Sequence, residues 1–375
     1  MKVAVIGLGA MGSLALWQLA QQGVKAVGFE QFGLADARTG VGGESRLFRT
    51  AYKEGPQYVP LLKRARVLWR ELEAQTGQAL LHLNGGLTIG HPADEAIARV
   101  LQSIEQFAID HQRLAPAEAR ARFPAHRFSD DEVVIFDRES GYLRPELAVT
   151  SALRRARDLG AEVHGHSPVA RVEQRGDGVW LELAGAWQRF DKVLVTAGGW
   201  VKRLYPALGS PVFTRKLILS WFPARDIAAF SPERFPIFTR RSQGYFSFGV
   251  PSLEGSMVKV GISTPGHVVE HPDQVDLRIS EAELADTRHV IQHFLNGLDP
   301  DPVRSSGHLD AYSADSHAVI GHPPGQPGVL LVGGFSGHGF KLAPAIGEAA
   351  TALLLGRPAP VSVSAFNLHR LPVFH

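Results

Sequence analysis

The sequence predicts an α/β fold in which a domain built on a parallel sheet is interrupted twice by a second, mostly antiparallel domain. Two glycine-rich turns, within Val3–Glu30 and at Gly333–Lys341, each follow an apolar strand-like run and precede a helix-like one. Strand-like segments dominate the middle of the chain, from Val212 to Thr264. The length of 375 residues exceeds one compact core, so about two domains are expected.

The N-terminal turn has the pattern of a dinucleotide-binding βαβ unit. An apolar strand, VAVIG, leads into G-x-G-x-x-G, a helix is expected over Ser13–Gln22, and a second strand over Ala26–Phe29 delivers Glu30. The three glycines are Gly7, Gly9 and Gly12. They allow a tight turn, close approach to a pyrophosphate and close packing of helix on strand, while the acid accepts hydrogen bonds from a ribose. These features predict a Rossmann-like domain, against the alternative of a turn that binds nothing.

The C-terminal turn, GGFSGHGFK, carries four glycines and ends in a lysine at the start of a helix. Glycines let a backbone pass close to a flat or charged group. The amides of such a turn point outward at a helix start, where partial positive charge collects. One cofactor could therefore span both turns.

Hydrophobic periodicity predicts the elements between the turns. Further helices are expected over Tyr58–Thr76, Ala93–Gln112, Pro145–Leu159, Glu281–Leu295 and Leu342–Leu355. Short strands are expected over Asn84–Gly90, Glu132–Asp137, Glu162–His164, Arg171–Gln174, Val179–Ala184, Asp191–Thr196 and Val329–Val332, and a loop over Pro265–Gln274. We therefore assign residues 1–85, 145–209 and 306–375 to the nucleotide-binding domain, and residues 86–144 and 210–305 to the inserted domain.

Composition excludes several classes of function. The formal net charge is +2 and no basic stripe with interleaved aromatic residues occurs, so nucleic acid is not an expected partner. The chain has no cysteine, which excludes disulfides and thiolate chemistry, and no metal site is expected. No apolar run approaches the roughly 18 residues needed to span a bilayer. Because the fold is expected to begin at Lys2, without a signal peptide, a cytoplasmic location is expected.

Four motifs occur in order: VAVIGLGAMG…GFE, ESRLFRTAY (Glu44–Tyr52), MVKVGIS (Met257–Ser263) and GGFSGHGFK. Together they resemble the monomeric sarcosine oxidase / N-methyltryptophan oxidase family of D-amino acid oxidase-like FAD enzymes. The resemblance implies an FAD-binding domain and a mostly antiparallel substrate domain, an architecture of the glutathione reductase-2 type. It also implies oxidation of a secondary or N-methyl amino acid to an imine, with O2 reduced to H2O2. A small-molecule amino acid and O2 are then the expected partners of a chain that is favoured to be monomeric.

The resemblance assigns catalytic roles to four cations. It places Arg46 against the flavin ring, Arg49 and Lys341 on the substrate carboxylate, and Lys259 under the flavin, where a cation stabilises charge as oxygen reacts. A guanidinium binds a carboxylate bidentately and stays charged. Spacing alone would put the two arginines on one face of a helix or turn. Solvated arginines, a surface lysine and a solvent-facing strand lysine are the alternatives.

The resemblance also implies wider sets of binding residues. For the substrate these are Arg49, Lys341, Phe248 or the neighbouring Tyr245, Asp310 and Ser263. For the cofactor they are Gly7, Gly9, Met11, Gly12, Glu30, Ser45, Arg46, Val172, Gly198, His308, Gly334, Gly337, His338, Gly339, Phe340 and Lys341. The amides of Gly337–Phe340 are expected to face the flavin pyrimidine edge. His338 is expected to make a structural hydrogen bond, with a role as catalytic base as the alternative.

The chain departs from the family at the substrate pocket and at the flavin attachment point. His308 stands where many members carry the cysteine that binds FAD covalently, so non-covalent FAD is expected, with a histidyl link as the alternative. Asp310 and Ser263 stand where sarcosine enzymes carry tyrosine and histidine. An amino acid carboxylate is therefore a firmer expectation than sarcosine itself. Asp310 binds a cationic substrate group or is a solvated turn residue.

Other activities remain open from the sequence. The chain could oxidise a primary, cyclic or basic amino acid, or act as a dehydrogenase of the same superfamily with an electron acceptor other than oxygen. A flavin-binding protein without turnover is disfavoured by the presence of Arg49, Lys259 and Lys341. A nicotinamide-dependent dehydrogenase is disfavoured because the C-terminal turn has no role in one.

Overall fold

A computed structural model describes residues 1–263 and 268–372 of the chain. Among these residues a six-stranded sheet has the order β20-β21-β13-β1-β2-β9 and is parallel except at β20. Its strands are β1 (Lys2–Ile6), β2 (Lys25–Phe29), β9 (Glu162–His164), β13 (Lys192–Val195), β20 (Val319–Gly321) and β21 (Val329–Gly333). This is the parallel sheet that the two glycine-rich turns predict, and the turns leave the carboxyl ends of β1 and β21, the two parallel strands on either side of β13.

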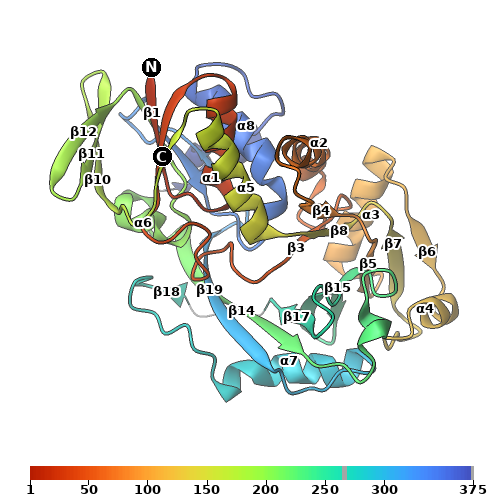
Figure 1. Cartoon of the computed structure of the whole chain (residues 1–375). Helices are drawn as coiled ribbons and strands as arrows, with labels where there is room; N and C mark the ends of the chain where they lie inside the picture. The colour runs from red at the N-terminus through yellow and green to blue at the C-terminus, as the bar shows by residue number, and fades with distance from the viewer. Residues whose placement is uncertain (264–267, 373–375) are drawn as a thin grey trace.

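Helices cover one face of this sheet and a small sheet lies against the other. Figure 1 shows α1 between α5 and α8, and these helices share one apolar core with α2. Their bounds are α1 (Ala10–Gln21), α2 (Val59–Thr76), α5 (Pro145–Asp158) and α8 (Ala343–Leu354). On the opposite face of the sheet a second apolar core is covered by β10 (Val169–Arg175), β11 (Gly178–Leu183) and β12 (Ala186–Phe190), and the short helix α6 (Val201–Leu204) also contributes to it. Both faces of the parallel sheet are thus buried, as parallel sheets require.

The third glycine of the N-terminal pattern fixes how α1 packs on β1. A Cβ at Gly12 would lie 1.9 Å from the carbonyl oxygen of Gly7 and 2.5 Å from Oγ1 of Thr196. No side chain fits at either distance, so only glycine lets the first turn of the helix approach the strand. Gly7 itself has φ +85°, a conformation that side chains rarely adopt.

The second half of the molecule is a mixed, mostly antiparallel sheet. Nine described strands form it, in the order β18-β14-β17-β16-β15-β5-β7-β6 with β19 also paired to β14, and only the β15–β5 pair is parallel. These are β5 (Gly86–Gly90), β6 (Gln112–Leu114), β7 (Val133–Asp137), β14 (Val212–Phe222), β15 (Ile237–Ser242), β16 (Tyr245–Val250), β17 (Val258–Ile262), β18 (Val268–Val269) and β19 (Arg304–Ser313). A phenylalanine-rich core packs α7 (Glu281–Phe294) and α4 (Pro116–Arg122) against it. In Figure 1, α7 runs along the outer side of β14 and β17.

A short sheet joins the two halves and carries one of the predicted motifs. It consists of β3 (Arg46–Phe48), β8 (Gly141–Leu143) and β4 (Leu81–His82), and α3 (Glu95–Phe107) lies beyond it on the side of β5. Because β3 begins at Arg46, the SRLFR segment is extended. The two arginines therefore do not share a helix face as their spacing suggested.

The predicted fold class is confirmed, and four local predictions need correction. The helix expected over Ala93–Gln112 ends at Phe107, because Ala108 is left-handed with φ 49°. The sequence analysis predicted the two strands that correspond to β10 and β11 but missed β12, which pairs with β11 as the third strand of this small sheet. The domain boundary expected between residues 305 and 306 falls inside β19, which pairs with β14 along its whole length. Of the loop expected over residues 265–274, residues 265–267 lie outside the described residues and Val268–Val269 form β18.

None of the helices that the structure describes is long and apolar enough to cross a membrane.

Candidate functional site

A large cavity lies where the two halves meet. Its volume is about 2020 Å³, including the mouth that opens to solvent. The walls come from both glycine-rich turns, from the SRLFR segment, and from β14, β16, β17 and β19 of the antiparallel sheet. It therefore brings together residues that lie more than 300 positions apart, such as Gly9 and Lys341.

One end of the cavity is formed by the N-terminal turn. Gly7, Gly9, Met11 and Glu30 line it, whereas Gly12 does not, in keeping with its packing role. The buried carboxylate of Glu30 accepts hydrogen bonds from the amides of Leu8, at 2.9 Å, and Phe32, at 3.1 Å. Burial raises the pKa of Glu30. The first turn of α1 has no side-chain cap at Gly9, so its amides are available to an anion.

Two further cations line the cavity, the half-buried Arg46 and the buried Lys259. The Arg46 guanidinium donates to the carbonyl oxygens of Gly40, at 2.8 Å, Gly42 and Ser45, at 2.7 Å. The ammonium of Lys259 donates to the carbonyls of Gly43, at 3.0 Å, and Ser45, at 2.6 Å. Burial lowers the pKa of Arg46, and burial together with the nearby Arg46 holds the pKa of Lys259 well below its ordinary value. Neither forms an ion pair with a described residue.

Arg49 is a buried arginine with few partners. Its side chain is 6% exposed, and the one hydrogen bond of its guanidinium within the described chain runs from Nη1 to Oγ1 of Thr239 in β15, at 3.3 Å. Its Nε has no hydrogen-bond partner among the residues that the structure describes. A buried donor without a partner carries a full desolvation cost, which a bound acceptor would remove.

Lys341 lies across Tyr52 from Arg49. Its ammonium donates to the Tyr52 hydroxyl at 3.0 Å and to the carbonyl of His338 at 2.8 Å. Both cations also lie over the Tyr52 ring, Lys341 at 5.0 Å and Arg49 at 5.7 Å from its centroid. Burial, reinforced by Arg49, lowers the pKa of Lys341 to about 7. These two groups are the carboxylate-binding pair that the resemblance implied, and they remain a proposal for that role.

Three residues at this end went unnoticed in the sequence: Tyr52, Lys53 and Glu54. Lys53 pairs with Glu54 at 2.7 Å and lies 4.6 Å from the centroid of the Phe246 ring, and Lys53, Glu54 and Phe246 all line the cavity. The second carboxylate oxygen of Glu54 is buried and has no hydrogen-bond partner in residues 1–263 and 268–372. Burial alone would raise the pKa of Glu54, but the cations around it, Lys53 first, lower that pKa below its usual range. The tripeptide follows SRLFRTA directly, so its position beside Arg49 was the available signal.

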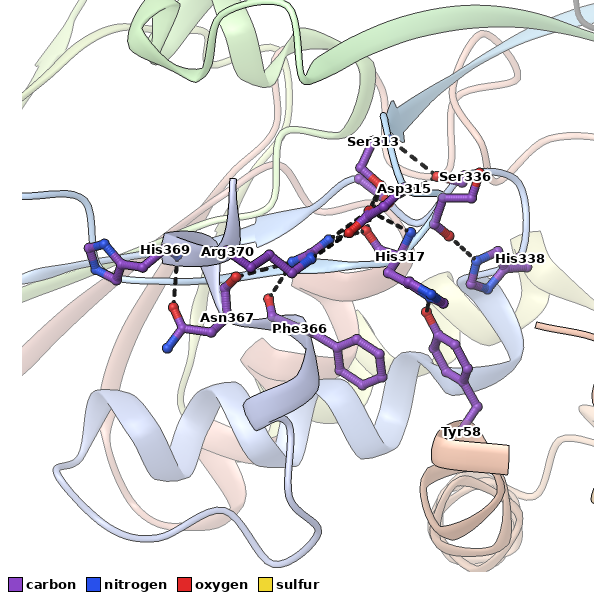
Figure 2. A network of polar contacts seen from close by, with 12 residues as sticks. Tyr58, Ser313, Asp315, His317, Ser336, His338, Phe366, Asn367, His369 and Arg370 are labelled. Atoms are coloured by element: carbon purple, nitrogen blue, oxygen red, sulfur yellow. Dashed lines mark hydrogen bonds and ion pairs between the residues drawn. The ribbon is translucent and has the colours of Figure 1, made fainter. Parts of the chain in front are cut away.

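The C-terminal turn meets the cavity through its glycines and is held from behind. His338 has both ring nitrogens bonded, Nδ1 to the Tyr52 hydroxyl at 3.1 Å and Nε2 to the carbonyl of Ser316 at 2.9 Å. Burial lowers its pKa to about 4. Figure 2 shows the polar network behind it, in which Asp315 pairs with Arg370 of the C-terminal segment at 2.7 Å. His338 thus has the contacts of a structural histidine.

The amides of this turn do not all face the cavity, which corrects one expectation. The amide of Gly337 donates to the Asp310 carboxylate at 2.9 Å, and that of His338 donates to the carbonyl of Phe335 at 3.0 Å. The amide of Gly339 has no partner within the described chain, and it belongs to a residue that lines the cavity. Of the four amides expected to face the cofactor, only those of Gly339 and Phe340 remain candidates.

His308 and Asp310 lie on β19 and line the cavity. His308 Nδ1 bonds the carbonyl of Ala37 at 2.7 Å and Nε2 bonds the hydroxyl of Ser306 at 2.7 Å. With both nitrogens taken, a covalent bond to His308 would cost one of these contacts. Burial raises the pKa of Asp310 to about 6, and its carboxylate is occupied by the amides of Ala311 and Gly337. Asp310 is half-buried in strand β19 and holds two backbone amides, which corrects the solvated-turn alternative.

The remaining predicted residues divide into those that line the cavity and those that do not. Phe248 and Ser263 line it, whereas Tyr245 points to α7, where its hydroxyl lies 3.5 Å from Asp286. Val172 is absent from the wall, where Val169 takes its place. The others that line it are Ser45, Gly198, Gly334, Gly339 and Phe340. Across the described residues no group of three potential ligands could hold a metal ion.

The residues present fit FAD. The uncapped start of α1 suits a pyrophosphate, and the Glu30 carboxylate lies at the end of β2, where a ribose is expected. The unpaired cations Arg46 and Lys259 and the free Gly339 amide suit a ring system that gains negative charge on reduction.

Comparison with known proteins gives the same result. The family model described as DAO, FAD dependent oxidoreductase, matches residues 2–353. The chain is 33% identical to the monomeric sarcosine oxidase of Streptomyces avermitilis over 374 residues, which covers 98% of this chain and 97% of that protein. It is 32% identical to the N-methyl-L-tryptophan oxidase of Salmonella typhimurium over 369 residues, with 98% of each chain covered.

Solved structures share the fold. NikD, an amino acid oxidase of nikkomycin biosynthesis, superposes with a TM-score of 0.85 at 19% identity, covering 97% of this chain and 96% of NikD. Glycine oxidase from Geobacillus kaustophilus gives a TM-score of 0.79 at 19% identity, with 98% of each chain covered. At this identity the likeness concerns the fold alone.

Proposed function

This chain belongs to the DAO family of FAD-dependent oxidoreductases, and from that premise we propose that it oxidises a secondary or N-methyl amino acid to an imine, with O2 reduced to H2O2. The observation that carries the proposal is the pair Arg49 and Lys341. Both are 6% exposed, both line one cavity, and neither forms an ion pair with a described residue. Buried charges without counter-ions are costly, so an anionic group of the substrate is the expected partner.

The carboxylate of an amino acid would give both Arg49 and Lys341 a charged hydrogen-bond acceptor. Its two oxygens accept charge-assisted hydrogen bonds from the Arg49 guanidinium and the Lys341 ammonium. Thr239 and Tyr52 hold these two donors in place, at 3.3 Å and 3.0 Å. Holding the carboxylate fixes the orientation of the carbon that carries the amine, and orientation of this kind supplies several kcal/mol of an enzyme's barrier reduction.

FAD, when bound, supplies the two-electron acceptor. The amine and its carbon give up two electrons and two protons, the resulting imine is hydrolysed by water, and O2 takes up two electrons and two protons as H2O2. The phenylalanines at positions 246 and 248 and Ile262 contribute apolar wall beside the carboxylate pair, which excludes water from the reacting carbon. We assign Lys259 the role of stabilising negative charge on oxygen as it is reduced.

An aerobic assay tests the proposal. Purified yellow protein is incubated with a panel of N-methyl, cyclic, basic and primary amino acids, and H2O2 is quantified against the substrate consumed. One peroxide per substrate for an N-methyl or other secondary amino acid supports the oxidase. Anaerobic bleaching of the flavin without peroxide in air, but with reduction of an added dye, would instead identify a dehydrogenase. No bleaching by any member of the panel would overturn the proposal.

A further inference from the structure

Lys53 lines the cavity beside the carboxylate pair, and the proposed reaction gives it no role. Its ammonium forms an ion pair with Glu54 at 2.7 Å, and its side chain is 26% exposed. An ammonium has three donors, and this ion pair is its one polar contact within the described residues, so further donors are available to a ligand. The ammonium also lies 4.6 Å from the centroid of the Phe246 ring, which lines the same cavity.

Strand β16 relates the position of Lys53 to that of Arg49. Phe246 and Phe248 are two residues apart on this strand, so their side chains point to the same face of the sheet. Phe248 pairs in register with Thr239, whose hydroxyl accepts a hydrogen bond from Arg49. Two residues of a strand span about 7 Å. Arg49 therefore lies at the level of Phe248, and Lys53 lies one side-chain row further along, at the level of Phe246.

The charges around this part of the cavity do not balance. The carboxylate of Glu54 lies among three cations, Lys53, Arg49 and Lys341, and all three act on it through space. All four of these residues line the cavity. The α-carboxylate of an amino acid would compensate one of the two excess positive charges and leave the other. Charges that are largely removed from water are costly without a counter-ion, so a second anionic group is expected here.

A second carboxylate on the substrate would supply this charge. It would accept a charge-assisted hydrogen bond from the Lys53 ammonium. The side chains of aspartate and glutamate are of a length that matches one side-chain row, and the rings of Phe246 and Phe248 offer their methylene groups an apolar wall. A basic side chain would instead place a like charge beside Lys53, and a neutral one would leave the excess charge uncompensated.

We propose that Lys53 binds a second carboxylate, so that the preferred substrates are N-methyl or other secondary amino acids with an acidic side chain. The proposal rests on the oxidation proposed above and names the class of side chain. Arg49 and Lys341 hold the α-carboxylate, whereas Lys53 holds the far end of the side chain and does not contact the reacting carbon. Lys53 is thus a residue that determines specificity.

The test compares acidic compounds with uncharged ones of the same shape. N-methylaspartate is matched with N-methylasparagine, and N-methylglutamate with N-methylglutamine, each as both enantiomers. Anaerobic reduction of the FAD-loaded protein gives a Kd and a saturating rate for each compound. Calorimetry with succinate and with its monoamide, succinamate, gives a readout that does not need turnover. The variants are Lys53→Gln, the conservative Lys53→Arg, and Lys63→Gln at an exposed lysine of α2 as the matched control.

We expect the wild type to bind each acid about tenfold or more tightly than its amide, because a charge-assisted hydrogen bond is stronger than a neutral one. Lys53→Gln should abolish this preference by raising the Kd of the acids, while the saturating rate of reduction changes less than about twofold, as for a residue that contributes binding alone. Lys53→Arg should restore most of the preference. Lys63→Gln should behave as the wild type.

Equal affinity of the wild type for acids and amides, or a preference that survives in Lys53→Gln, would overturn the acidic class and leave the oxidase proposal intact. The wild-type comparison needs no variant, so it decides even if Lys53→Gln does not fold. If no compound of the panel reduces the flavin, the oxidase proposal fails for these substrates. The Kd values of succinate and succinamate then decide for or against carboxylate binding by Lys53.

Discussion

The ammonium group of Lys341 donates a hydrogen bond to the hydroxyl of Tyr52, 3.0 Å away. Tyr52 in turn lies within 3.1 Å of Nδ1 of His338, whose other nitrogen is fixed by Ser316. Lys341 is therefore positioned by a chain of buried polar groups that begins behind the cavity wall. The Glu54 carboxylate acts on both Lys341 and Arg49 through space, but its ion pair is with Lys53, so both cations remain available to the same anion.

Replacement of Arg49 is expected to weaken carboxylate binding most. Arg49→Met removes the guanidinium and should lower kcat/KM by about 100-fold, since a charge-assisted hydrogen bond contributes roughly 1.5–3 kcal/mol. Arg49→Lys should recover only part of the loss, because an ammonium cannot bind two oxygens in the same plane. Steady-state kinetics and the Kd of acetate measure both effects. Arg278→Met, at a side chain that is 90% exposed, is the control, and an unchanged Kd in Arg49→Met would contradict the assignment.

Carboxylate binding is expected to weaken as pH rises through about 7. Burial lowers the pKa of Lys341 to about 7, so the free protein carries this charge below that pH and loses it above. A bound anion favours the charged form and raises its pKa. The Kd of acetate should therefore be constant at lower pH and rise about tenfold per pH unit above about 7, until the pKa of the complex is reached. In Lys341→Arg the charge persists, so the Kd should stay flat over this range. The pH range to measure is 6 to 9, from roughly one unit below the pKa of Lys341 to roughly two units above it. A wild-type Kd that does not change over this range would contradict the predicted role of Lys341.

Lys259→Met is expected to separate the two half-reactions. The substitution removes a buried cation whose hydrogen bonds go to the carbonyls of Gly43 and Ser45 and involve neither Arg49 nor Lys341, so reduction by the amino acid should change little. Reoxidation by O2 should slow by about 100-fold or more, since the charge that develops on oxygen loses its stabilising group. Stopped-flow absorbance measures each step separately. Lys25→Met, at an exposed lysine at the start of β2, should alter neither, and equal slowing of both steps in Lys259→Met would exclude the proposed role.

Acid precipitation is expected to release FAD into the supernatant. The chain has no cysteine, and His308 uses both ring nitrogens in hydrogen bonds to Ala37 and Ser306. The matched variant is His308→Cys, which restores a thiol at the position where related enzymes carry one and is expected to retain part of the flavin in the pellet. Absorbance of both fractions measures the partition. Yellow colour that stays with the wild-type precipitate would show a covalent link.

The segments predicted correctly are those whose signal is local. The N-terminal turn follows from three glycines and an acid at fixed spacing, and the structure shows why the third glycine cannot change: a Cβ there would overlap the Gly7 carbonyl. The fold class followed from such segments and from the strand-rich middle. The four predicted lysine and arginine positions of the cavity wall came from the family motifs, because a single buried cation produces no periodic pattern in the sequence.

The parts that could not be predicted depend on partners far apart in the chain. The electrostatic surroundings of Glu54 include Lys341 and His338 of the C-terminal turn, which come near it only in the folded chain. The amide of Gly337 donates a hydrogen bond to the Asp310 carboxylate, whereas the sequence of the turn alone predicted that this amide would face a cofactor. Strand β19 was divided between two domains because its pairing with β14 spans about 90 residues and no nearby turn marks it. Contacts of this kind exist only in the folded molecule.

Arg49 and Lys341 both belong to segments outside the antiparallel sheet, whereas Phe248 and Ser263 belong to the sheet and its border. Under the proposed function, binding of the amino acid carboxylate and selection of its side chain are divided between two parts of the molecule. New specificities can arise through substitutions in the sheet that leave the carboxylate grip intact. Enzymes that diverge in this way keep the same reaction while their substrate specificity changes.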